Sequence, residues 1–327
     1  MILSKTPLRM SYVGGGSDIS TFYRDEIGAV LSTSVDKYIY VGVNKKFDGR
    51  IRLSYSKTEE VENLADISHP LVRESLKLLN ISGGIEITTM ADIPSKGSGL
   101  GSSSSFVVGL LNALYAYKNE YVSKETLARQ ACQIEIEKCK EPIGKQDQYA
   151  ASYGGLNLIK FHNNESVSID PVICSSEVLN QIEKSTLIFY TGRTRSASVI
   201  LEQQTKNLLN INTKNLVRRM VELAFELKVE IELGSLDNFG AILNENWHLK
   251  KQLAGGVSDI QIDDWYNRGL KAGADGGKLL GAGNGGFLMF FAPNDKHQSI
   301  KLELKELRPI QFGFDNNGAQ IIFYQPN

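Results

Sequence analysis

Alternating apolar and polar positions predict that the chain opens with strands. β-Branched and aromatic residues alternate with polar ones through most of the first 55 residues, as expected for a half-buried sheet. Shorter segments of the same kind recur later and at the end of the chain. The expected strands are 2–13, 28–42, 50–55, 84–89, 155–161, 166–169, 185–192 and 318–324.

Helical spacing of apolar residues begins directly behind a Gly/Ser stretch. Phe106, Leu110 and Leu114 lie on one face of the predicted helix. A second helix is expected from Ser123, a good N-cap residue, with Glu125 in its first turn, to about residue 140. The further helices expected are 145–153, 197–209, 213–229, 235–253 and 260–273.

The order of these elements favours an α+β fold in two parts. Strands and helices are mixed without the regular alternation that builds a doubly wound parallel sheet. A chain of 327 residues exceeds the usual size of one hydrophobic core. The segment 171–184 shows the weakest pattern, so we predict domains at 1–175 and 176–327.

Composition narrows the class of protein. Apolar residues make up 42% and charged residues 22%, with 36 basic and 37 acidic side chains, which is typical of an ordinary globular protein. There is no charged block to suggest nucleic-acid binding and no apolar run long enough for a membrane span. Three scattered cysteines and no signal peptide favour the cytoplasm. The four histidines lack metal-ligand spacing.

The stretch PSKGSGLGSSSSF at 94–106 predicts an anion site. Its serines run straight into a helix, whose first N–H groups have no internal partners and carry the positive end of the helix dipole. Gly97, Gly99 and Gly101 allow close approach of the backbone to a ligand. The stretch matches neither GxxxxGK[ST] nor a GxGxxG turn after a strand. A plain Ser-capped helix behind a flexible loop is the alternative.

Two other glycine-rich segments and two acidic residues are further candidates for a ligand-binding site. YVGGGSDIS at 12–20 ends a strand in three glycines followed by Asp18, which is suited to binding hydroxyl groups or, alternatively, to capping a turn. The third glycine-rich segment, KLLGAGNGGFLMFF at 278–291, is consistent with a ligand-binding loop or with a tight hairpin. Glu135 and Asp147 are flanked by apolar residues, and a buried carboxylate is costly unless it is paired or binds a cation.

Taken in order, these segments resemble the three motifs of the GHMP kinases. The first is TPLRMSYVGGGSD at 6–18, the second IPSKGSGLGSSSS at 93–105 and the third KLLGAGNGGF at 278–287, so the resemblance spans the chain. It implies a two-domain GHMP kinase fold, with an N-terminal domain like ribosomal protein S5 and a C-terminal ferredoxin-like α+β domain. It also implies a cytoplasmic enzyme that uses ATP and Mg²⁺.

The resemblance implies roles for residues of the first motif. Arg9 stands where similar kinases have a basic residue that stabilises the attacking oxygen. Asp18 corresponds to the acid that contacts substrate hydroxyls. Galactokinases carry Glu-His where this chain has Gly15 and Gly16, which suggests a roomier substrate site.

The resemblance also implies the catalytic acid and the magnesium ligands. Asp147 matches the catalytic aspartate, Glu135 the glutamate that holds magnesium, and Ser103 the serine ligand. Ser102 and Ser104 are expected to donate to phosphate. The glycines assigned to ATP binding are Gly97, Gly99 and Gly101.

Within the family, the GGGSD, GKQDQYAASYGGLN and YTGRTRSASVILEQQ segments are most similar to D-glycero-D-manno-heptose 7-phosphate kinases. This implies transfer of phosphate to the anomeric hydroxyl of a sugar phosphate, giving heptose 1,7-bisphosphate. Arg193, Arg195 and Lys145 would then face the distal phosphate, with Gly283 also in the substrate site. Asn284 replaces the usual glycine and tolerates a positive φ. A solvated strand end is the alternative for the arginines.

Other functions remain open on the sequence alone. A fucokinase- or galactokinase-like sugar 1-kinase shares the GGGSD pattern. A non-catalytic sugar or nucleotide sensor would also keep the fold, although it has no need of Arg9, Glu135 and Asp147 together. A homodimer is left open.

Overall fold

A large mixed sheet forms the first layer of the molecule. The structure is a computed structural model that describes residues 1–93, 97–193 and 197–325. The strands of this sheet follow the order β12-β1-β2-β5-β3-β4, with β6 and β7 extending from β2. They are β1 (Ile2–Val13), β2 (Gly28–Lys45), β3 (Ile51–Ser54), β4 (Thr58–Val61), β5 (Ile85–Ala91), β6 (Leu156–Phe161), β7 (Val167–Pro171) and β12 (Gln320–Tyr324).

Strand β2 connects two parts of this sheet because it is long enough to pair with different neighbours along its length. Residues 39–45 pair with β5, whereas residues 28–33 pair with β6. Along most of its length β2 also pairs antiparallel with β1. The alternating residues of 2–13 and 28–42 therefore form the predicted strands.

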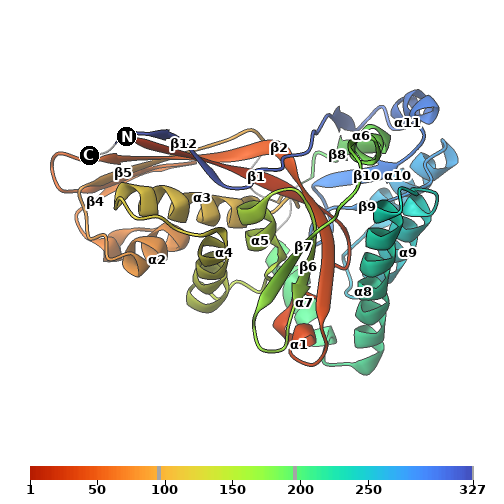
Figure 1. The fold of residues 1–327 in the computed structure, drawn as a ribbon, viewed down its shortest axis with the longest axis horizontal. Coiled ribbons are helices and arrows are strands. Elements are labelled where there is room, and N and C mark those ends of the chain that lie inside the picture. Colours follow the sequence, from red (N-terminus) through yellow and green to blue (C-terminus); the bar gives the residue numbers. More distant parts are fainter. Residues whose placement is uncertain (94–96, 194–196, 326–327) are drawn as a thin grey trace.

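Helices of the first half cover one face of this sheet (Figure 1). The helix α3 (Ser102–Tyr117) lies along β1 and β2 and is buried on nearly all sides, since even Gly109 packs against side chains of β1. The other helices of this part are α1 (Ser20–Tyr23), η1 (Leu64–Asp66), α2 (Pro70–Leu78), α4 (Lys124–Cys132), the π-helical turn η2 (Gln133–Lys138) and α5 (Gln146–Tyr153).

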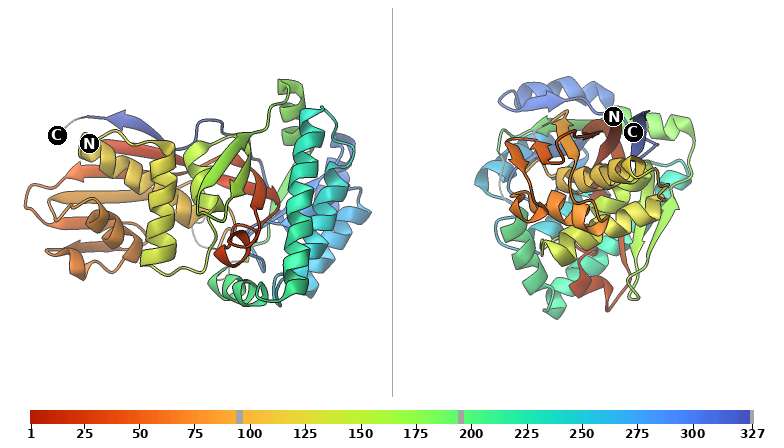
Figure 2. Two further views of the ribbon diagram at one scale, coloured as in Figure 1. Left: turned by 60° about the horizontal axis from the view of Figure 1, so that its bottom comes forward. Right: turned by 90° about the vertical axis from the view of Figure 1, so that its left-hand side faces the viewer.

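A smaller antiparallel sheet, in the order β11-β8-β10-β9, organises the second half. Its strands are β8 (Thr186–Tyr190), β9 (Gly276–Leu279), β10 (Phe287–Phe291) and β11 (Arg308–Ile310). The long helices α8 and α9 stand side by side (Figures 1 and 2), with α9 packed against β9 of this sheet and α8 against β2 of the first sheet. The helices of this half are α6 (Ser176–Ser185), α7 (Ala197–Asn207), α8 (Ile211–Glu232), α9 (Phe239–Lys251), α10 (Ile260–Lys271), η3 (Asn294–Lys296) and α11 (His297–Glu303).

The chain ends in the sheet in which it began. Strand β12 pairs antiparallel with β1, so the two termini lie together at one end of the molecule (Figure 1). Residues 320–324 thus belong to the first sheet, although the predicted second domain runs to 327. The boundary at 175/176 itself stays a prediction.

Local signals in the sequence agree with the structure at some points and not at others. The Ser123 hydroxyl accepts a hydrogen bond from the Thr126 N–H and so caps α4, as expected. The helix predicted to run to about residue 140 instead turns π-helical at Gln133. The weakly patterned segment 171–184 contains most of α6, which buries only Ile182 and Ser185.

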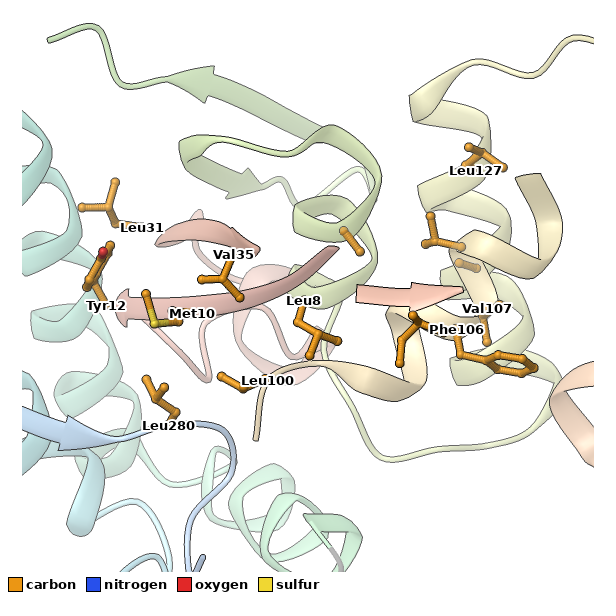
Figure 3. Packing of buried hydrophobic residues seen from close by; sticks show 14 of the residues in the cluster. Leu8, Met10, Tyr12, Leu31, Val35, Leu100, Phe106, Val107, Leu127 and Leu280 are labelled. Atoms are coloured by element: carbon orange, nitrogen blue, oxygen red, sulfur yellow. The ribbon is translucent and has the colours of Figure 1, made fainter. Parts of the chain in front are cut away.

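The buried core continues across the contact between the two halves. Met10 of β1, Leu100 of the glycine-serine loop and Leu280 after β9 belong to one buried cluster and lie close together (Figure 3). Each of these side chains is almost fully buried. Apolar packing therefore holds the second and third glycine-rich segments against the first. Among the described residues, the helices include none with the length and apolarity that crossing a membrane requires.

Candidate active site

A cavity of about 280 Å³ lies where the three glycine-rich segments meet. Its described lining comes from residues 9–19, 97–104 and 135–147 of the first half and from 198–204 and 250–282 of the second. The predicted site residues Arg9, Asp18, Ser103, Glu135 and Asp147, which are far apart in sequence, all line it. Gly15, Gly16, Gly97, Gly99, Gly101, Ser102 and Ser104 line it as well.

The predicted anion loop runs into the N-terminus of α3. Gly97, Gly99 and Gly101 all have positive φ angles of 66° to 76°, which L-residues rarely adopt. Gly101 is the residue before the helix, so the first N–H groups of α3 lie at the cavity. This geometry is suited to holding phosphate oxygens.

The glycines of this loop serve a second purpose that the sequence did not reveal. A Cβ on Gly99 would lie 2.5 Å from the carbonyl oxygen of Leu280, and one on Gly281 would lie 2.3 Å from the Cα of Gly99. A Cβ on Gly286 would likewise meet the Ser98 carbonyl oxygen at 2.3 Å. The second and third motifs therefore pack backbone against backbone, which only glycine permits.

The serines of the loop differ in their surroundings. Ser103 is exposed toward the cavity, and its hydroxyl donates to Glu135 Oε1 at 2.7 Å. Ser102 and Ser104 are buried, and the Ser102 hydroxyl is 2.9 Å from that of Ser98. Ser105 points away and donates to the Pro7 carbonyl oxygen. Ser103 is thus the member of the run that a ligand reaches most readily.

Glu135 is fully buried beneath this serine. Its second carboxylate oxygen accepts a hydrogen bond of 2.6 Å from the Gln148 amide. Burial raises the pKa of Glu135 to about 7, against hydrogen bonds from Ser103, Ser104 and Gln148 that favour the charged form. A buried carboxylate beside a hydroxyl is an all-oxygen donor set that fits Mg²⁺, which usually takes one or two carboxylates and completes its shell with water and substrate phosphate.

Arg9 and Asp147 form a close ion pair on the same side of the cavity. The Arg9 Nε and a terminal nitrogen both lie 2.7 Å from Asp147 Oδ1, and the other terminal nitrogen donates to the Gly99 carbonyl oxygen. Arg9 is only 5% exposed, so its guanidinium is fixed. Asp147 Oδ2 has no bond to Arg9, and it faces Gly101, where a Cβ would lie 3.1 Å away.

Asp18 is buried in a turn formed by two segments. Its carboxylate accepts hydrogen bonds from the Gly16 N–H at 3.0 Å and from the Gln146 N–H at 3.2 Å. Burial and the nearby Asp147 raise the pKa of Asp18. Gly144 lies so close that a Cβ there would be 1.9 Å from Asp18 Oδ2.

The replacement Gly144→Ala is therefore expected to displace Asp18. Because a shift of about 1 Å in a positioning group can lower activity about 10²-fold, kcat/KM for the substrate should fall by about that factor. Gly255→Ala is a matched control, since a Cβ there meets nothing within 4 Å. Steady-state kinetics of both variants would test this, and an unchanged kcat/KM in the Gly144 variant would argue against a role for Asp18 in binding the substrate.

Two basic residues of the predicted site, Lys145 and Arg193, are not part of the cavity lining. The Lys145 ammonium pairs with Glu165 at 2.6 Å and lies over the ring of Tyr23. The Arg193 guanidinium donates to both carboxylate oxygens of Asp259, at 3.2 and 2.5 Å. Because these cations already have acidic partners, neither contributes charge to the cavity as the structure stands.

The third motif also places its residues differently from the prediction. Gly281 and Ala282 line the cavity, whereas Gly283 packs against the backbone of Val257. Asn284 has a φ of 60°, the positive value that asparagine tolerates. Arg195, predicted to bind the distal phosphate, lies outside the described residues.

Sequence reasoning missed two lysines in the cavity wall. Lys250 is 6% exposed and donates to the Gly281 carbonyl oxygen. Lys278 is 2% exposed and donates to the carbonyl oxygens of Ser11 and Tyr12 at 2.7 and 2.8 Å. Apolar neighbours on the buried face of α9 could have marked Lys250 as unusual, but its approach to the third motif depends on the tertiary fold.

The geometry narrows the class of protein to the phosphotransferases. A helix N-terminus suited to phosphate and a buried carboxylate suited to magnesium share one cavity with an arginine-aspartate pair. In-line phosphoryl transfer depends on such positioned cations and on an acid that orients the attacking hydroxyl.

Comparisons with known proteins agree with this class. Residues 66–155 match the model of the GHMP kinases N terminal domain, and residues 227–308 match that of the GHMP kinases C terminal domain. A D-glycero-alpha-D-manno-heptose 7-phosphate kinase from Campylobacter jejuni is 32% identical over 98% of both chains. The chain therefore belongs to the GHMP kinases and is an ATP-dependent sugar kinase.

Two solved structures have the same fold. A putative sugar kinase from Campylobacter jejuni, 28% identical, superposes with a TM-score of 0.79 over 98% of this chain and 97% of that one. A D-glycero-D-manno-heptose 1-phosphate kinase from Bacteroides thetaiotaomicron, 24% identical, superposes with a TM-score of 0.82 over 99% of this chain and all of the other. The predicted two-domain GHMP kinase fold is thus confirmed.

Proposed function

We propose that this kinase transfers the γ-phosphoryl group of ATP to the anomeric hydroxyl of D-glycero-D-manno-heptose 7-phosphate. The observation that carries the proposal is the Arg9–Asp147 pair beside the glycine-serine loop, because it sets an acid and a cation next to an anion site. The name of the Campylobacter relative, 32% identical over nearly the whole chain, supports the choice of sugar.

Residues of the first half would bind the nucleotide, accept the proton and stabilise the developing charge. The 97–104 loop and the first turn of α3 would hold the triphosphate. Asp147 would accept the proton of the anomeric hydroxyl at Oδ2, while Arg9 offsets the charge that develops on the attacking oxygen. The new bond joins this oxygen to the γ-phosphorus as the bond to the β-phosphate oxygen breaks, which yields heptose 1,7-bisphosphate and ADP.

Ser103 and Glu135 are the residues that would hold Mg²⁺. When bound, this ion would neutralise phosphate charge and the charge of the buried carboxylate, whose pKa is raised to about 7 by burial. Within the described part of the chain, no group of three or more His, Cys, Asp or Glu residues could hold a metal. A site built from one carboxylate, one hydroxyl and substrate phosphates is consistent with that finding.

The distal phosphate of the sugar requires cations that can bind it. Arg193 and Lys145 are paired with Asp259 and Glu165, so either would have to exchange a carboxylate for a phosphate. Arg195 stays a candidate from the sequence. A fucokinase- or galactokinase-like activity on an unphosphorylated sugar is the alternative, whereas membership of the kinase family does not support a non-catalytic sensor.

A substrate panel separates these possibilities. We expect ATP consumption with heptose 7-phosphate to exceed that with galactose, fucose or mannose by at least about 10²-fold in kcat/KM, since a charged group bound by arginine contributes strongly to affinity. Coupled ADP release measures each rate. A preference for an unphosphorylated sugar would reject heptose 7-phosphate and the role of the two arginines.

A further inference from the structure

The two walls of the cavity differ in charge. Its acidic side chains in the described residues all come from the first half, namely Asp18, Glu135, Glu141 and Asp147. The described part of the wall from the second half contributes two lysines instead, Lys250 on α9 and Lys278 on β9. Gln204 of α7 adds an amide that is 3% exposed and whose nitrogen has no hydrogen-bond partner among the described residues. The second wall is therefore rich in donors.

Among the described residues, three cations line the cavity, and they are not equally available to a ligand. Arg9 is neutralised by Asp147 and is also bonded to the Gly99 carbonyl oxygen. Lys278 donates to two carbonyl oxygens of β1, which ties β9 to the first motif. In the described part of the chain, Lys250 has one hydrogen-bond partner, the Gly281 carbonyl oxygen, and no carboxylate in an ion pair. An ammonium has three donors, so Lys250 retains two.

The position of Lys250 relates it to the point of phosphoryl transfer. Its partner Gly281 packs directly on Gly99, whose carbonyl oxygen holds Arg9. Lys250 lines the same cavity as Arg9, Asp18 and Asp147 and interacts electrostatically with all three. A buried ammonium that forms no direct ion pair is costly, and a bound anion would reduce that cost.

We propose that Lys250 binds the γ-phosphoryl group of the nucleotide from the wall that the second half contributes to the cavity. Its N–H groups would donate to oxygens of the phosphoryl group as it moves from ADP to the acceptor. The inference rests on the proposed function for the presence of ATP, and it does not depend on which sugar is the acceptor. It assigns α9 a part in catalysis, in addition to the three glycine-rich motifs.

Measuring nucleotide binding to the Lys250→Met variant tests this proposal in the absence of the sugar. Isothermal titration in the presence of Mg²⁺ would compare a non-hydrolysable ATP analogue with ADP. We expect the variant to bind the analogue at least about 10-fold more weakly while its affinity for ADP changes little, because only the analogue carries the γ-phosphate. An equal change for both nucleotides, or none, would overturn the proposal.

Further variants separate a loss of charge from a loss of structure. Lys250→Arg should retain most of the preference for the analogue, whereas Lys250→Gln, which keeps a donor without the charge, should not. If the Met variant fails to fold, these two decide the result. Lys251→Met is the matched control, since Lys251 pairs with Asp263 and does not line the cavity.

The outcome also distinguishes this inference from the substrate assignment. If the wild type phosphorylates no sugar of the panel but prefers the ATP analogue through Lys250, the proposed acceptor is wrong and the inference stands. If the sugar is phosphorylated and Lys250→Met leaves kcat and the nucleotide preference unchanged, the inference is wrong and the proposed function stands.

Discussion

Replacing Asp147 by asparagine is expected to lower turnover by at least about 10²-fold, as loss of a general base usually does. Asparagine keeps an oxygen that can accept the 2.7 Å hydrogen bond from Arg9, but it cannot take a proton from the sugar hydroxyl. The charge of Arg9 would remain, so nucleotide affinity should stay close to that of the wild type. Single-turnover rates with saturating ATP and sugar give the direct measurement.

Stability provides the control for this variant. Loss of one member of a buried ion pair costs about 3–5 kcal/mol, but Asp147 is 23% exposed and asparagine keeps the hydrogen bond, so we expect a smaller loss of unfolding free energy. Asp170→Asn is a matched comparison, because Asp170 pairs with Lys160 on β6. Full activity in the Asp147 variant would exclude it as the catalytic base.

Local patterns in the sequence were sufficient to predict much of the fold. The alternation in 2–13 and 28–42 predicted both strands, although the structure buries both faces of residues 6–13 and 28–35. The Ser123 cap is a hydrogen bond to a residue only three positions away, so it could be predicted locally. The segment of α6 was missed because this helix buries few apolar side chains. Strand β12 was predicted as a strand, yet its pairing with β1 spans the whole chain and leaves no local signal.

In the candidate site, too, contacts between residues far apart in sequence could not be predicted. Motifs identified Arg9, Glu135 and Asp147, and the structure brings them to one cavity. Arg193 was read as free to bind phosphate because its partner Asp259 lies 66 residues away in sequence. Lys250 was missed for the corresponding reason: its only hydrogen-bond partner in the described chain is a carbonyl oxygen of another motif. Pairings between residues far apart in sequence decide which cations are available, and the sequence does not encode these pairings locally.

Replacing Lys250 by methionine is expected to stabilise the protein at neutral pH while it impairs catalysis. Burial, together with Arg9, lowers the pKa of Lys250 to about 8, although Asp18 and Asp147 act in the opposite direction. The ordinary pKa is 10.5, so at pH 7 the lysine is charged in both folded and unfolded states and destabilises the folded one. At about 1.4 kcal/mol per pKa unit, methionine should raise the free energy of unfolding by up to about 3 kcal/mol.

The pH dependence of this gain has a definite sign. As the pH rises from about 8 towards 10.5, folded Lys250 loses its proton first, and the advantage of methionine should shrink and then vanish. Burial and the charge of Lys250 also lower the pKa of Lys278. Replacing Lys250 by methionine removes this repulsion, so the pKa of Lys278 should rise towards its ordinary value. Urea unfolding of the wild type and the variant at pH 7 and pH 10 measures the difference, with Lys251→Met as control.

A destabilising charge that persists in a binding cavity is expected where function requires it. If methionine at position 250 instead destabilises the protein at pH 7, the bond from Lys250 to the Gly281 carbonyl oxygen outweighs the cost of burial, and Lys250 holds the third motif in place. If methionine stabilises the protein and the preference for the γ-phosphate is lost, the cost of the buried charge in the free enzyme is offset when the nucleotide binds. Lys250 would then connect the stability of the second half directly to phosphoryl transfer in the first.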